Sequence, residues 1–121
     1  MREAILVVED HRVIREGMIQ LLNREGFVGV PAANGQEALD YFRAGGHATV
    51  IVLDLSMPVM NGWTFRRVQN GDPALAAIPT IILSGINSAP FEDDCPAAVL
   101  AKPVDPQQLL TLLHTLCEDG H

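Results

Sequence analysis

Five short runs of apolar residues, rich in β-branched side chains, recur along the chain and constrain its fold more than any other feature. The runs lie at residues 4–8, 27–30, 49–53, 80–83 and 98–101. Most of them lack alternation between apolar and polar residues, which is typical of strands covered on both faces by helices in a parallel sheet. The run at 27–30 is short and contains Gly29, so we expect it at an edge of the sheet.

The segments between these runs change to the periodicity of amphipathic helices. Apolar residues three and four apart define one face of a first helix and one face of a last helix: Ile14, Met18, Leu21 and Leu22, and then Leu109, Leu112, Leu113 and Leu116. Asn34 with Glu37 resembles a capping box at a helix start, and Asp105 is placed as an N-cap before a proline. A further helix is predicted over residues 61–68, followed by a turn at 70–73.

Strand and helix therefore alternate five times, which predicts an α/β doubly wound sheet in a single domain of residues 1–121. The fourth helix is expected to be short or irregular. Its segment, from Ile86 to Ala97, has only twelve residues and contains Pro90 and Pro96. A chain of 121 residues can bury a core without disulfides or a structural metal.

Charge and hydropathy restrict the functions open to such a domain. Fifteen acidic against eight basic residues give a formal net charge of −7, which disfavours direct binding to nucleic acid phosphates. No apolar run approaches the roughly 20 residues of a membrane span, and the first residues do not resemble an export signal. We therefore expect no membrane insertion, a cytoplasmic location, and reduced thiols at Cys95 and Cys117.

Polar side chains follow four of the five apolar runs at the point where each run ends: Glu9 and Asp10, Asp54, Ser84, and Lys102. In open α/β sheets, ligands bind beyond the carboxyl ends of the strands where the winding reverses. For the strand order 2-1-3-4-5, that place lies between the first and third strands, which carry Glu9, Asp10 and Asp54. The three carboxylates are therefore expected to meet at one rim of the sheet.

Three carboxylates in a partly desolvated cleft repel one another unless a cation lies between them. Oxygen ligands without cysteine or histidine favour Mg²⁺, with Mn²⁺ as a substitute, and Mg²⁺ commonly binds carboxylates together with phosphate oxygens. Lys102 would add a positive charge and Ser84 a hydroxyl, both suited to phosphoryl oxygens. Asp54 can then serve as the nucleophile of a phosphoryl transfer, because aspartyl phosphates are established covalent intermediates.

Four segments carry a resemblance to a known family. They are Leu6-Val7-Val8-Glu9-Asp10, the stretch from Val50-Ile51-Val52-Leu53-Asp54 through Met57-Pro58 to Asn61-Gly62, then Ile81-Ile82-Leu83-Ser84-Gly85, and Lys102-Pro103. Together, in this order and each at a strand end, they resemble the signature of response-regulator receiver domains over essentially the whole chain. The resemblance implies a flavodoxin-like five-stranded parallel sheet in the order 2-1-3-4-5.

The resemblance also implies a role for each polar residue of the rim. Asp54 would be the phosphoacceptor, and the metal ligands would be Glu9, Asp10, Asp54 and the Ser56 backbone carbonyl. Ser84 would supply the switch hydroxyl. Lys102 would be the phosphate-binding lysine, followed by a cis peptide bond to Pro103. A sensor histidine kinase or a phosphotransfer protein would be the donor, and a downstream protein would receive the signal. Such a domain catalyses only its own phosphorylation and dephosphorylation.

Two departures from the family pattern concern the signal output. Receivers usually carry an aromatic residue three positions before the lysine, where this chain has Val99. The connection from Ser84 to Lys102 is also shorter than the family pattern implies. The surface formed by the fourth helix, fifth strand and fifth helix is therefore expected to differ from the usual one.

Other interpretations of the same residues remain open. Asp10 or Asp54 could serve only as a helix or turn cap. The domain could be a passive docking module whose Asp54 is not used, or a fragment of a larger hybrid kinase or regulator. A magnesium phosphohydrolase is a weaker hypothesis, because Ser56 stands where such enzymes place a second carboxylate.

Overall fold

The computed structural model describes residues 3–54, 62–84 and 96–119, and of residues 62–63 and 118–119 it describes the backbone alone. Its centre is a parallel sheet of five strands: β1 (Ala4–Val8), β2 (Val28–Ala32), β3 (Val50–Asp54), β4 (Thr80–Ser84) and β5 (Ala98–Ala101). The strand order is β2-β1-β3-β4-β5, and all four pairings are parallel. The predicted α/β class and strand order are confirmed, including the edge position of β2.

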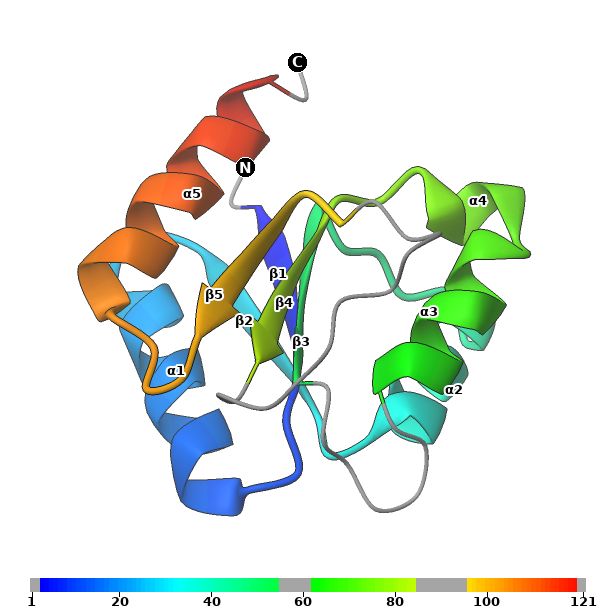
Figure 1. Cartoon of the computed structure of the whole chain (residues 1–121), viewed down its shortest axis with the longest axis horizontal. Helices are drawn as coiled ribbons and strands as arrows, with labels where there is room; N and C mark the ends of the chain where they lie inside the picture. The colour runs from blue at the N-terminus through cyan, green and yellow to red at the C-terminus, as the bar shows by residue number, and fades with distance from the viewer. Residues whose placement is uncertain (1–2, 55–61, 85–95, 120–121) are drawn as a thin grey trace.

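Helices cover both faces of the sheet: α1 (Arg12–Arg24), α2 (Gly35–Arg43), α3 (Gly62–Asn70), α4 (Pro73–Ala76) and α5 (Pro106–Asp119). Figure 1 shows α1 and α5 on one side of the sheet and α2, α3 and α4 on the other. None of the helices that the structure describes combines the length and the apolar composition needed to cross a membrane.

Successive residues of the central strands belong to two different cores. Ile5 and Val7 of β1 pack in the cluster that includes α1 and α5, whereas Leu6 and Val8 pack in the cluster with α2 and α3. The interior of each central strand must therefore be apolar on both sides, because both of its faces are buried. This requirement explains the uninterrupted apolar runs, and it leaves polar residues only at the ends of the strands.

The helix starts follow the predicted capping patterns. Asn34 accepts a hydrogen bond from the Glu37 amide at 2.9 Å, and the Glu37 carboxylate accepts one from the Ala33 amide at 2.8 Å. Before α5, the Asp105 carboxylate accepts a hydrogen bond from the Gln107 amide at 3.0 Å. The starts of these two helices are thus set locally, by side chains that satisfy otherwise unpaired backbone N–H groups.

Two elements differ from the sequence-based expectation. Strand β2 begins one residue later than expected and continues two residues further, through Pro31. An edge strand tolerates this proline because only one of its sides pairs with a neighbour. The second difference is α4, a single helical turn that directly follows the turn predicted at residues 70–73 and that the sequence did not predict.

The short helix α4 depends on a buried polar side chain. Asp72 caps its start by accepting a hydrogen bond from the Ala74 amide at 3.0 Å. Gln69, fully buried at the end of α3, donates hydrogen bonds to the carbonyls of Leu75 and Ile78 at 3.0 and 3.1 Å. The connection from α3 to β4 is therefore held by the side-chain amide of Gln69 inside the protein.

The helix α4 is not the fourth helix that we expected between Ile86 and Ala97. Most of that segment lies outside the described residues.

Candidate functional site

The carboxyl ends of β1 and β3 bring three acidic residues together. Val8 lies beside Leu53 in the register of these two strands, so the residues that follow, Glu9 and Asp54, come to adjacent positions. Ligand oxygens of Glu9, Asp10 and Asp54 all lie within 4.8 Å of one another. The convergence expected from the strand ends is thus present in the fold.

Lys102 completes the rim from the end of β5. Its amide donates a hydrogen bond to the Ser84 carbonyl at 2.9 Å, which ties the segment to the end of β4. Its Nζ donates to Asp54 Oδ1 at 2.5 Å, and the Lys102 side chain is 35% exposed whereas that of Asp54 is 2% exposed. The Lys102-Pro103 peptide bond is cis, as the resemblance implies. Asp54 is therefore a buried carboxylate paired with an ammonium group that solvent can reach.

Glu9 is the other buried carboxylate of this rim, and its environment is unfavourable for a negative charge. Its Oε1 accepts a hydrogen bond from the His11 amide at 3.1 Å. Its Oε2 is buried and has no hydrogen-bond partner in the part of the chain that the structure describes. Burial, and in addition the negative charge of Asp54, raises the pKa of Glu9 to about 7 although the His11 amide lowers it.

The donor set of this rim fits a hard divalent cation. Three carboxylates from two strand ends offer oxygen ligands only, which Mg²⁺ and Mn²⁺ prefer over softer metals. The buried Oε2 of Glu9, with no partner among the described residues, is the kind of atom that a nearby cation would satisfy. Asp10 is the exposed member of the same cluster, so a ligand can reach its carboxylate from solvent.

Asp10 does not cap the first helix. The N-cap of α1 is His11, whose Nδ1 accepts a hydrogen bond from the Ile14 amide at 3.5 Å. The alternative in which Asp10 serves only as the N-cap is therefore wrong, because the next residue takes that position.

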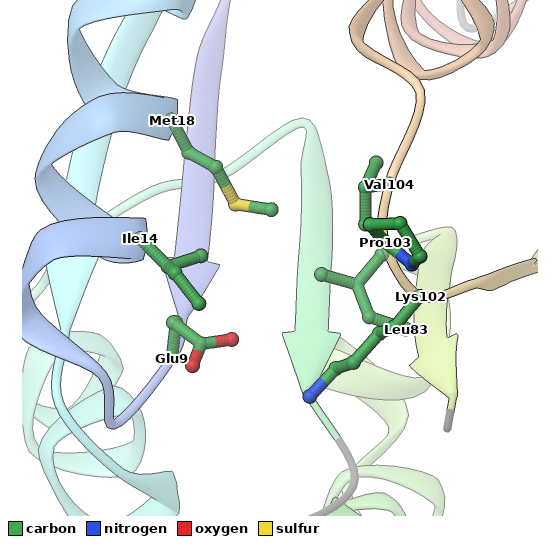
Figure 2. A pocket seen from close by; sticks show the side chains of 7 residues that line it. All are labelled: Glu9, Ile14, Met18, Leu83, Lys102, Pro103 and Val104. Carbon is green, nitrogen blue, oxygen red and sulfur yellow. The ribbon is translucent and has the colours of Figure 1, made fainter. Parts of the chain in front are cut away.

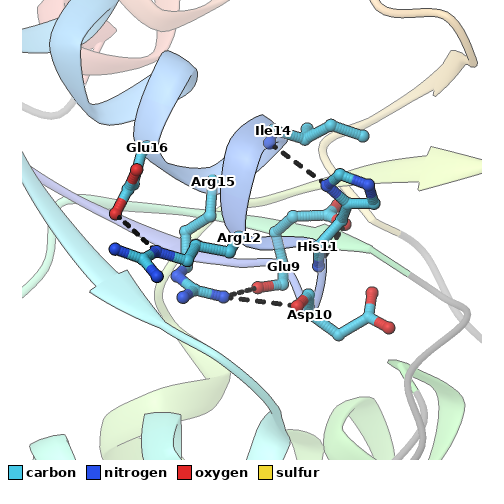
Figure 3. Close-up of polar contacts among 7 residues, drawn as sticks. All are labelled: Glu9, Asp10, His11, Arg12, Ile14, Arg15 and Glu16. Atoms are coloured by element: carbon cyan, nitrogen blue, oxygen red, sulfur yellow. Dashed lines mark hydrogen bonds and ion pairs between the residues drawn. The ribbon is translucent and has the colours of Figure 1, made fainter.

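Arg15 is a site residue that the sequence analysis missed. Its guanidinium donates hydrogen bonds to the backbone carbonyl of Glu9 at 2.8 Å and to that of Asp10 at 3.4 Å, as Figure 3 shows. The available signal was its place in the first turn of α1, because helical side chains point back toward the N-terminus of their helix. Such a side chain can reach the segment that precedes the helix.

An apolar cavity opens beside the acidic cluster. It has a volume of about 610 Å³ and lies between α1 and the connection from β5 to α5, lined by Glu9, Ile14, Met18, Leu83, Lys102, Pro103 and Val104. Figure 2 shows the Glu9 carboxylate and the Lys102 amino group at the same end of this cavity, with Met18 and Val104 toward the other end. The polar rim is thus continuous with an apolar recess.

Of the remaining predicted site residues, Ser84 ends β4 and is partly buried. Val99 lies on β5 with 56% of its surface exposed. Ser56 lies outside the described residues, as does Cys95, whereas Cys117 is a free, buried cysteine. The structure thus brings together Glu9, Asp10, Asp54 and Lys102, with Ser84 on the strand beside Lys102.

Comparison with known protein families gives one match over most of the chain. The model of the Response regulator receiver domain matches residues 5–114. The chain belongs to this family. The receiver domain is 33% identical over 114 residues to Two-component response regulator 24 of Arabidopsis thaliana, a match that covers 92% of the chain and 81% of the relative.

Longer proteins contain similar receiver sequences. The domain is 40% identical over 88 residues to the alkaline phosphatase synthesis transcriptional regulatory protein SphR of Synechococcus elongatus, covering 66% of the chain and 34% of SphR. It is 32% identical over 120 residues to the sensor kinase CckA of Brucella abortus, covering 94% of the chain and 12% of CckA. The chain therefore spans about a third of one of these relatives and about an eighth of the other.

Solved receiver structures share the fold. A response regulator receiver protein from Pseudomonas putida superposes with a TM-score of 0.84 and 29% identity, covering 95% of this chain and 98% of that one. The chemotaxis protein CheY4 of Vibrio cholerae gives a TM-score of 0.83 and 26% identity, covering 96% and 99%. The receiver architecture thus extends over nearly the whole chain.

Proposed function

We propose that this receiver domain accepts a phosphoryl group on Asp54 from a phosphohistidine of a sensor histidine kinase or phosphotransfer protein. The observation that carries the proposal is the buried Asp54 carboxylate, which lies between Lys102 and two further carboxylates at one rim of the sheet. A two-component receiver implies a histidine kinase as partner, and this rim supplies the acceptor chemistry that such a partner needs.

In the transfer, an oxygen of Asp54 forms a bond to phosphorus while the bond from phosphorus to the donor's imidazole nitrogen breaks. The electron pair of the broken bond stays on that nitrogen, so the donor leaves as histidine. Lys102 moves its ammonium group from Asp54 to an oxygen of the transferred group, and the Ser84 hydroxyl binds a second oxygen. These contacts offset charge that would otherwise accumulate in a buried place.

Glu9, Asp10 and Asp54 would hold Mg²⁺, with Mn²⁺ as a substitute. The backbone carbonyl of Ser56 would join them, as the family resemblance implies. Bound there, the cation supplies positive charge that lets the three carboxylates and a phosphoryl group lie close together. The chain's own residues orient the acceptor: β3 positions Asp54, and the ion pair with Lys102 orients its carboxylate.

The phosphorylated domain would signal by a surface change that a downstream protein recognises. Val99 stands at the position of the usual aromatic switch residue and is largely exposed, so the relay from Ser84 uses other side chains here. Water ends the signal by hydrolysing the aspartyl phosphate, and the domain has no external substrate.

The test is incorporation of phosphate from a small acyl phosphate donor in Mg²⁺, followed by mass spectrometry of peptides. Wild-type protein is expected to gain one phosphoryl group on Asp54, and Asp54→Asn is expected to gain none. Asp72→Asn, which alters an exposed helix cap, is the matched control and should be labelled like wild type. Absence of label in the wild type, or equal label in Asp54→Asn, overturns the proposal and favours a passive docking module.

A further inference from the structure

We propose that Arg15 is a positioning residue that holds the backbone of Glu9 and Asp10 so that their carboxylates converge on the divalent cation. The inference rests on the proposed function, because it assigns a role in the same cation site. Within the described residues, the side chain of Arg15 forms no hydrogen bond or ion pair with the three carboxylates. It acts through the main chain of the segment that carries two of them.

The contacts of Arg15 lie at the bend between β1 and α1. The Glu9 amide still belongs to the sheet, since it donates to the Ala32 carbonyl at 3.0 Å. The helix begins its own hydrogen bonding at the His11 carbonyl, which accepts from the Arg15 amide at 2.9 Å. The carbonyls of Glu9 and Asp10 thus lie between the two regular elements, and one guanidinium nitrogen of Arg15 donates to both.

This bend sets the direction of two side chains that must point to the same place. Glu9 is 2% exposed, so its carboxylate points into the protein. Asp10, the next residue, is exposed to solvent. Consecutive residues on a strand point in opposite directions, so convergence requires that the chain leave the strand geometry between them. A planar guanidinium that donates to both carbonyls stabilises this bent backbone.

The direction in which cation affinity changes when Arg15 is replaced distinguishes a positioning role from a purely electrostatic one. A positive charge near the site repels a divalent cation, so if Arg15 acted only through its charge, its removal would tighten cation binding. If Arg15 positions the carboxylates, its removal weakens binding although a repulsive charge is lost. The two roles therefore predict opposite changes in affinity.

Arg12 offers a matched control on the same helix. It carries the same charge three residues before Arg15, but its guanidinium pairs with Glu16 at 3.1 Å and its side chain is 80% exposed. Replacing Arg12 thus removes one positive charge from the start of α1 and leaves the contacts of Arg15 intact. The comparison of Arg15→Gln with Arg12→Gln isolates the contact from the charge.

The experiment titrates Mg²⁺ into wild type, Arg15→Gln, Arg15→Lys and Arg12→Gln by calorimetry, at a temperature where circular dichroism shows each protein folded. We expect Arg15→Gln to bind Mg²⁺ about 10-fold more weakly, as is usual when a residue that orients ligands is lost. Arg12→Gln should bind as wild type does or slightly more tightly. Arg15→Lys keeps the charge and a donor, so it should regain part of the loss and serves as the second variant if Arg15→Gln does not fold.

Amide NMR spectra of the metal-free proteins give a second readout. Arg15→Gln should shift the resonances of Glu9 and Asp10, whereas Arg12→Gln should leave them in place. A folded Arg15→Gln that binds Mg²⁺ as tightly as wild type overturns the positioning role alone. Wild-type protein that binds no Mg²⁺ instead overturns the cation site of the proposed function, so the two failures are distinguishable.

Discussion

Glu9 has a buried carboxylate oxygen beside Asp54, and this environment raises its pKa from 4.5 to about 7. Burial is the first cause, because a charged carboxylate loses its hydration when it leaves water. Such a residue destabilises the metal-free domain when it ionises. The same property suits it to a cation, whose charge removes the penalty.

We predict that Glu9→Gln stabilises the metal-free domain at high pH. In the unfolded chain Glu9 releases its proton near pH 4.5, whereas in the folded chain it holds the proton up to about pH 7. Its contribution to stability is therefore full below about pH 4.5 and is lost as the pH rises through 7. Glutamine cannot ionise, so the variant should exceed wild type by on the order of 2–3 kcal/mol near pH 8 and match it near pH 4.

Urea unfolding in the presence of a chelator, at several pH values, measures this difference. Adding Mg²⁺ should reverse the ranking near pH 8, because the variant lacks one anionic ligand. A parallel pH dependence of stability in both proteins would contradict the raised pKa.

Lys102 is the cation that balances Asp54, and we predict that Lys102→Met destabilises the metal-free domain by about 2–3 kcal/mol near neutral pH. The variant removes the ammonium group that balances the charge of a buried carboxylate, which costs far more than the loss of a surface pair. Arg43→Met is the control, since Arg43 and Asp40 form an exposed pair 3.9 Å apart that contributes little. Chemical denaturation of both variants tests the contrast, and equal effects would show that burial does not govern the Asp54 pair.

At the scale of elements, the end of α2 shows how closely a loop can pack on its own helix. A side-chain carbon added at Gly46 would lie 2.5 to 2.6 Å from ring carbons of Tyr41. The ring cannot easily move away, because its hydroxyl donates to the His47 carbonyl at 2.6 Å and accepts from the His47 amide at 3.1 Å. Glycine is therefore required here for space.

We predict that Gly46→Ala lowers the free energy of unfolding by about 1–3 kcal/mol through this overlap. Gly17→Ala is the opposite case, since no atom lies within 4 Å of a methyl group placed there in the middle of α1. That substitution should stabilise the domain by about 0.5–1 kcal/mol, because alanine is the better helix former. Thermal unfolding of the two variants distinguishes them by sign.

At the scale of the whole molecule, the acidic rim couples cation binding to folding. Its three carboxylates come from two strands that the unfolded chain does not hold together, and the full sequence carries a net charge of −7. A cation that binds only the folded state stabilises it by mass action. We predict that Mg²⁺ at 100 times its dissociation constant raises the free energy of unfolding by about 2.7 kcal/mol.

Denaturation at increasing Mg²⁺, with Na⁺ at matched ionic strength as the control, tests this coupling. Asp54→Asn should reduce the gain, because it removes a ligand at the centre of the rim. Equal stabilisation by Na⁺ would indicate general screening of charge in place of a site.

The strand order came from the resemblance to receiver domains, but the amino-acid sequence alone predicted the class and the gathering of Glu9, Asp10, Asp54 and Lys102. It could do so because a strand buried on both faces must be apolar throughout, and parallel strands present all their carboxyl ends at one edge. The capping box at Asn34 and Glu37 was equally legible, since both partners lie within one helical turn.

Only the tertiary structure decided the burial of Glu9, the backbone contacts of Arg15 and the short helix held by Gln69. Each depends on the direction in which a side chain points, which sequence spacing alone does not encode. For Glu9 and Gln69, segments from elsewhere in the chain set the burial of the side chain. The pKa of Glu9 depends on neighbours from β3 and β5 as well as on its own strand. Long-range packing, which exists only in the folded chain, therefore sets the electrostatics of the site that the strand ends bring together.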